Sequence, residues 1–172
     1  MTAARVRASS QRPPQVNAIV RQLGEAMDDD QLPHEISVAV VYVDEHLMEL
    51  EAVVGAGRWS GCASAYTVFD AIATFAGALQ RFADGVDSQA EFVAGADNGG
   101  GLVALRFYRV DRAGHVVCHV RLATGGLPQD HRAEEVCRLS IEVPAETWAV
   151  VQFARQLGEL VRTQAGKASL QV

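Results

Sequence analysis

The chain has 172 residues, 49% of them apolar, and a formal net charge of −6. This length and composition predict a single folded domain and exclude wholesale disorder. An acidic chain without a basic stripe is a poor nucleic-acid binder, because the neutralisation of phosphates supplies most of a protein's affinity for nucleic acid. No apolar run is long enough to span a bilayer, and the first residues lack the continuous apolar stretch of a secretory signal. We therefore expect a cytoplasmic protein with neither a nucleic-acid nor a membrane partner.

The N-terminal region predicts a disordered lead over residues 1–14, followed by a helix and linker over residues 15–33. Apolar side chains recur at helical spacing from about residue 15 to residue 27, at Val16, Ile19, Val20, Leu23 and Met27. An acidic run at residues 28–30 and then Pro33 end this helix. The helix is expected to dock on the domain or on a second subunit, which leaves a homodimer open.

Two strands are predicted next. Residues 36–43 are rich in valine and indicate a buried strand, and residues 47–54 alternate acidic with apolar side chains. The Gly-rich stretch around Trp59 breaks regular structure, and a short third strand through residues 59–65 is compatible with the pattern.

A central helix is predicted to begin at Thr67, whose spacing from Asp70 is that of a capping box. One apolar stripe marks its buried face, formed by Val68, Ile72, Phe75, Leu79 and Phe82. Gly85 is a natural stop just beyond its C-terminus. This stripe should be the main cover of the sheet.

A strand over residues 90–95 precedes an antiparallel meander over residues 102–143, in which apolar and polar side chains alternate. The side of the meander that carries Val116, Cys118, Val120 and Leu122 is expected to be buried, and Cys137 is assigned to the same apolar side. Pro144 is placed in the first turn of a last helix, whose stripe consists of Trp148, Val151, Leu157, Leu160 and Val161.

The predicted fold is α+β: an antiparallel meander covered on one face by the central and C-terminal helices, with an extra N-terminal helix. Residues 34–163 form the single domain, and residues 164–172 are expected to be a frayed tail.

No catalytic or metal-binding motif emerges. His115 and His119 lie about 13 Å apart along one strand, which is too far for one metal ion. The glycines near residue 100 run into a strand with no following lysine, unlike a phosphate-binding loop. A nucleophile elbow around Ser60 would require glycine at positions 58 and 62, where Arg58 and Cys62 stand, and Cys62 has no base that the sequence can place. We expect no cofactor and no enzymatic activity.

The candidate partner-binding residues fall into three groups. The wet face of the meander offers Arg106, His115, His119, Arg121, Arg138 and Glu142. Trp59 and Arg58 are of the types that anchor interfaces. Asp84 and Asp87, with Glu91, form an acidic patch that suits a basic partner. For each group, the simpler alternative is a solvated surface.

The layout resembles a known group of proteins. Its marks are a Trp-containing Gly-rich turn at residues 57–61, a helix at 68–82, Gly-His-Val opening a strand at Gly114, and a last strand leading into a helix at 139–161. Over residues 36–161 the chain looks like an uncharacterised bacterial domain-of-unknown-function family found near secretion and toxin loci. It is also similar in layout to WapI-type immunity proteins.

The resemblance implies a binding protein whose partner is a cognate toxin, and it transfers no catalytic residue. The alternative is a secretion chaperone that binds an effector segment. Chaperones of that kind have an α-β-β-β-α-β-β-α order, and the extra strands after the central helix count against this alternative.

Overall fold

The computed structural model describes residues 34–96, 100–125 and 135–171. The predicted lead and N-terminal helix lie outside these residues. The described elements are β1 (Glu35–Val43), β2 (Met48–Ala56), β3 (Trp59–Thr67), α2 (Phe69–Ala83), β4 (Gln89–Gly95), β5 (Gly100–Arg109), β6 (Val116–Gly125), β7 (Arg138–Ala145), α3 (Thr147–Thr163) and β8 (Lys167–Gln171).

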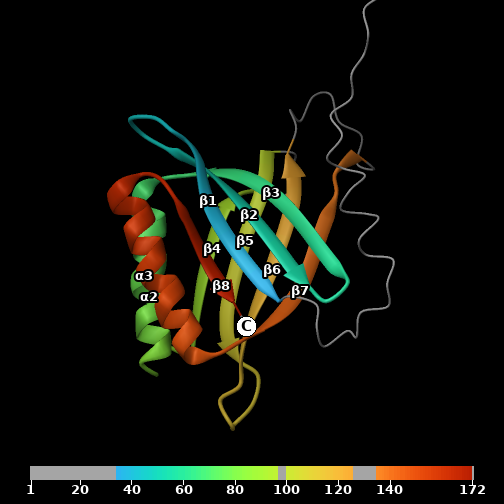
Figure 1. The fold of residues 1–172 in the computed structure, drawn as a ribbon, viewed down its shortest axis with the longest axis vertical. Coiled ribbons are helices and arrows are strands. Elements are labelled where there is room, and N and C mark those ends of the chain that lie inside the picture. The colour runs from blue at the N-terminus through green and yellow to red at the C-terminus, as the bar shows by residue number, and fades with distance from the viewer. Residues whose placement is uncertain (1–33, 97–99, 126–134, 172) are drawn as a thin grey trace, which may run out of the picture.

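The strands form two four-stranded antiparallel sheets. The first sheet has the order β3-β2-β1-β8, and the second sheet has the order β4-β5-β6-β7. The predicted α+β class is confirmed, as is the meander β5-β6-β7. The early strands, whose pairing the sequence leaves open, build a separate sheet together with β8. Figure 1 shows the two sheets facing each other, with α2 and α3 side by side along one flank.

The chain crosses between the sheets in the same way twice. Helix α2 leads from β3 of the first sheet to β4, an edge strand of the second sheet. Helix α3 leads from β7 of the second sheet back to β8, an edge strand of the first sheet. Each sheet is therefore followed by a helix that delivers the chain to the edge of the other sheet.

Strand β8 corrects the expectation of a frayed tail over residues 164–172. It pairs antiparallel with β1, so that Glu35 lies opposite Gln171. Ala168 and Leu170 point inward and are fully buried. A strand of five residues, three of them polar or charged, gives too weak a pattern to be recognised in the sequence. Its inward side chains are buried only because it pairs with β1, which is more than 120 residues earlier in the chain.

The inner faces of both sheets and the buried faces of both helices share one core. Four phenylalanines connect its layers. Phe75 of α2 stacks on Phe92 of β4 with ring centres 5.2 Å apart, and Phe107 of β5 lies 6.2 Å from Phe153 of α3. Burying each such ring stabilises the fold by roughly 1.5–3 kcal/mol.

The predicted buried side of the meander is confirmed on β6, where Val116, Cys118, Val120 and Leu122 are buried. Burial raises the pKa of the Cys118 thiol well above its usual range. Cys137 was wrongly assigned to the core, since it precedes β7 and is exposed. Cys118 lies opposite Val143, about 20 Å along the strand from residue 137.

Two predicted helix starts are also wrong. Thr67 is the last residue of β3, and α2 follows Val68 without a side-chain cap. Pro144 belongs to β7, where an edge strand tolerates proline because one side of its backbone needs no partner. Helix α3 begins at Thr147 instead. Gly85 does follow α2 with a φ of 78°, as predicted.

The stripe of α3 is displaced from the predicted one. Trp148 is 65% exposed, and Val151 and Val161 are only partly buried. The buried side chains are Ala149, Val150, Phe153, Ala154, Leu157 and Leu160. Small alanines on this face let α3 lie close to α2 and β8.

Candidate functional site: the outer face of the second sheet

The outer face of the second sheet carries its charged residues in straight cross-strand rows. Glu91 of β4 lies opposite Arg106 of β5, Arg106 lies opposite His119 of β6, and His119 lies opposite Glu142 of β7. Side chains directly opposite each other in antiparallel strands have Cβ atoms roughly 4.5–5.5 Å apart. The register therefore gathers four polar groups that come from well-separated parts of the sequence.

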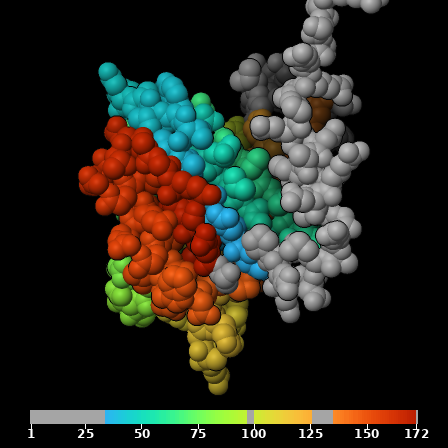
Figure 2. All heavy atoms as spheres, viewed as in Figure 1, coloured from blue at the N-terminus to red at the C-terminus, as the bar shows by residue number. Residues whose placement is uncertain are grey.

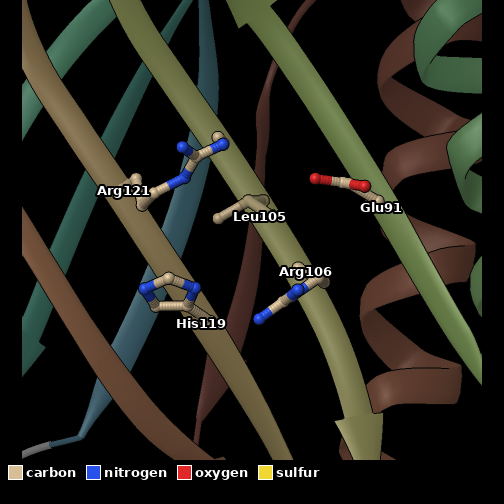
Figure 3. A pocket seen from close by; sticks show the side chains of 6 residues that line it. Glu91, Leu105, Arg106, His119 and Arg121 are labelled. Atoms are coloured by element: carbon tan, nitrogen blue, oxygen red, sulfur yellow. The ribbon is translucent and has the colours of Figure 1, made fainter.

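A hollow of about 220 Å³ opens next to this row. It is lined by Glu91, Ala104, Leu105, Arg106, His119 and Arg121 (Figure 3). Ala104 lies opposite Arg121, and its methyl group is too short to fill the space between the longer neighbours. At one end of the hollow Ala104 joins a small apolar cluster with Leu102, Ala123 and Val136.

Neighbouring contacts order the rim of the hollow. His119 Nε2 and Ser140 Oγ are 2.9 Å apart. The Tyr108 hydroxyl donates a hydrogen bond to the Glu142 carboxylate, which raises the pKa of Tyr108 above its usual range. The Arg106 guanidinium carbon lies 4.9 Å from the centre of the Tyr108 ring, within the range of a cation–π contact.

Two charged side chains of the hollow have no polar partner among the described residues. Arg121 and Glu91 make no hydrogen bond or ion pair within the described part of the chain. Arg106 Nε is buried and has no hydrogen-bond partner among those residues. In Figure 3 the Arg121 side chain on β6 and the Glu91 side chain on β4 point toward the hollow from either side of β5. The site can thus take an anionic group beside the arginines and a cationic group beside Glu91.

The sequence-predicted candidates divide between this face and the turns. Arg106, His119, Arg121, Arg138 and Glu142 all lie on the outer face of the second sheet. His115 lies in the β5–β6 turn, which projects from one end of the molecule (Figure 2). Its Nδ1 is 2.6 Å from Asp111 Oδ2, a contact that raises the pKa of His115 and lowers that of Asp111.

The other candidates lie elsewhere. Arg58 lies in the β2–β3 turn of the first sheet, and Trp59 is the first residue of β3, where it is 68% exposed. Asp87 pairs with Arg81 at 2.9 Å, and Asp84 accepts a 3.2 Å hydrogen bond from Gln80. Glu91 does not join these two aspartates, because alternation along β4 places it on the sheet face.

The hydrogen bond between His119 and Ser140 has the separation used in nucleophilic catalysis. The β6 amides near this pair are held in the ladders to β5 and β7, so they are not free to form an oxyanion hole. Within the described ranges there is also no group of three or more His, Cys, Asp or Glu residues that could hold a metal ion. No helix of that part is long and apolar enough to cross a membrane.

Sequence reasoning missed Tyr108 and Ser140. The same alternation that places Arg106 and Arg138 on the outer face also places Tyr108 and Ser140 there. They were not selected as candidates because the selection relied on charged side chains, and both of these are neutral. No protein-family model, curated protein or solved structure matches the chain significantly. The functional argument therefore rests on the chemistry of this face.

Proposed function

We propose that this protein is a non-enzymatic protein-binding module whose partner docks on the outer face of the second sheet. Its role is that of an immunity-type protein that binds and neutralises a bacterial toxin. The observation that carries the proposal is the hollow in which the exposed Arg121 guanidinium lacks a partner among the described residues. Unsatisfied guanidinium donors are suited to receive a carboxylate from another protein.

Charge supports a protein partner with acidic groups. This face carries Arg106, Arg121 and Arg138 against Glu91 and Glu142, whereas the whole chain has a net charge of −6. The arginines form a local positive patch on an acidic molecule. Complementary charge of this kind sets the orientation of a partner and rejects wrong ones.

Rigidity supports binding as well. Arg106, His119 and Arg121 lie on the central strands β5 and β6, and Tyr108 and Ser140 hold neighbouring side chains in place. A pre-organised surface loses little conformational entropy when a partner docks, so more of its contact energy appears as affinity. The hollow, about 220 Å³ in volume and lined mostly by charged and polar side chains, suits a protruding charged side chain of a protein.

The experiment is co-expression with the candidate toxin encoded by the neighbouring gene. Wild-type protein is expected to restore growth and to co-purify with the toxin, and Arg121→Glu is expected to lose both effects. Arg155→Glu is the matched control, because Arg155 is an exposed arginine on α3 that contacts only Gln152 in the described residues. Failure of the wild type to rescue growth contradicts the immunity role.

The secretion chaperone remains the alternative. A chaperone would bind an unfolded effector segment, whereas the proposed module binds a folded toxin. Binding retained by a heat-unfolded partner would favour the chaperone. The four strands between α2 and α3 depart from the element order expected for such chaperones.

A further inference from the structure

The outer face of the first sheet is not covered by α2 or α3, which lie along the flank of the two sheets (Figure 1). One row across this face consists of Ser169, Ser37, Val53 and Cys62, in adjacent strands from β8 to β3. Three of these side chains, Ser169, Ser37 and Cys62, are small, so the row leaves room for another element to pack close to the sheet. Val53 is 43% exposed in its middle.

A second row adds aromatic rings and charge. Tyr42 lies opposite Glu49, and Glu49 lies opposite Tyr66. Both tyrosines are half-exposed. A carboxylate flanked by two rings on a flat sheet offers apolar contact together with an attraction for a cation.

The charge of this face is negative. Glu35 is paired with Lys167 at 3.2 Å, so these two charges cancel. Glu49 and Glu51 remain, on neighbouring outward positions of β2. The outer faces of the two sheets therefore differ in sign, since arginines dominate the second sheet.

The segment that precedes β1 begins with a basic stretch. Residues 1–14 contain Arg5, Arg7 and Arg12 and no Asp or Glu, whereas residues 15–27 carry one base, Arg21, and one acid, Glu25. The stripe Val16, Ile19, Val20, Leu23 and Met27 needs an apolar surface to cover. A helix over residues 15–27 would be about 20 Å long, which matches the width of a four-stranded sheet.

The connection is long enough for docking within one chain. Residues 28–34 can span up to roughly 23 Å when extended. They lead directly into Glu35, the first residue of β1 in the same sheet. We propose that residues 15–27 dock as an amphipathic helix on the outer face of the first sheet of the same chain. The apolar stripe covers Val53 and Tyr66, and Arg21 faces Glu49 and Glu51.

Amide hydrogen exchange of the full chain, read by mass spectrometry, tests this proposal. The peptide covering residues 15–27 is expected to exchange at least tenfold more slowly than an unstructured chain. Val53→Arg is expected to abolish that protection. Val93→Arg should leave it intact, since Val93 is a valine with similar exposure, 48%, on the outer face of the second sheet.

Further controls separate docking from loss of the fold. Peptides from β5 and β6 must stay protected in both variants, and Ile19→Asp must expose residues 15–27 without affecting those strands. An unprotected wild-type peptide, or equal effects of the two valine variants, overturns the proposal. Protection of residues 15–27 that rises with protein concentration also overturns the proposal, because it would show that the helix docks on a second copy of the chain.

Discussion

The Tyr108 hydroxyl on β5 donates a hydrogen bond to the Glu142 carboxylate on β7 and so spans the intervening strand β6. The ring of Tyr108 also lies against the Arg106 guanidinium. The Tyr108 side chain therefore contacts both Glu142, at one end of the charged row, and Arg106, in its middle. The contact with Tyr108 restricts the orientation of the Arg106 side chain on the sheet face.

Removing this contact should affect recognition more than folding. Tyr108→Phe is expected to lower partner affinity several-fold while the free energy of unfolding stays close to that of the wild type, because the bond is exposed. Spectrophotometric titration gives a second readout. Glu142→Gln should bring the pKa of Tyr108 down toward its ordinary value of 10.0, because the hydrogen bond to Glu142 is the main cause of its elevation. An unchanged Tyr108 titration would contradict the contact.

The His115–Asp111 pair should make stability depend on pH. The hydrogen bond with Asp111 raises the pKa of His115 above 6.5, and the same contact lowers the pKa of Asp111 below 3.8. The histidine contribution is complete below pH 6.5 and is lost as the pH rises through the folded-state pKa. The aspartate contribution is present above pH 3.8 and is lost as the pH falls through its folded-state pKa.

Thermal denaturation of wild type and Asp111→Asn should therefore differ most between about pH 4 and pH 6.5. NMR titration of His115 should give a pKa above 6.5 in the wild type and a lower value in the variant. Equal titration curves would show that the pair does not form in solution.

Strand β8 should be essential for stability. Leu170→Ala is expected to cost about 2–5 kcal/mol in the free energy of unfolding, because the side chain is fully buried in the shared core. Gln171→Ala, at the next and exposed position, should stay within about 0.5 kcal/mol of wild type. Urea denaturation measures both variants, and a small effect at Leu170 would return the tail to the frayed state that its sequence suggests.

Gly101 lies where β5 of the second sheet comes close to β3 of the first sheet. Its φ is +82°, and an added Cβ would lie 2.2 Å from the Ser64 carbonyl oxygen of β3. Gly101→Ala should therefore destabilise the fold by more than about 2 kcal/mol, since both backbone strain and a backbone clash oppose it. Gly57→Ala shares the positive φ but has open space around the added atom, so about 1 kcal/mol is expected. Equal losses would contradict the close approach.

Local patterns in the sequence predict the elements better than their arrangement. The alternation on β6 and the stripe from Ile72 to Phe82 identify buried faces correctly because burial follows from periodicity alone. The same patterns could not show that the early strands form their own sheet, since strand pairing depends on long-range geometry. Leu170 illustrates this limit, because only its pairing with Ile36 explains why it is buried.

The candidate site follows the same division. Alternation alone places Arg106, His119 and Arg121 on the exposed side of the meander. Their convergence on one hollow depends on the register between β5 and β6 and on the small side chain of Ala104, and the sequence does not reveal that register. The role of Glu91 required the pairing of β4 with β5.

The most direct test of the proposed binding face is calorimetric titration of the purified partner, the toxin of the neighbouring gene, with wild type, Arg121→Glu and Arg155→Glu. Reversing the charge of an interface arginine costs at least about 2 kcal/mol, which corresponds to roughly a 30-fold weaker Kd. We predict that loss for Arg121→Glu and an unchanged Kd for Arg155→Glu. Wild-type affinity in Arg121→Glu would contradict binding through the outer face of the second sheet.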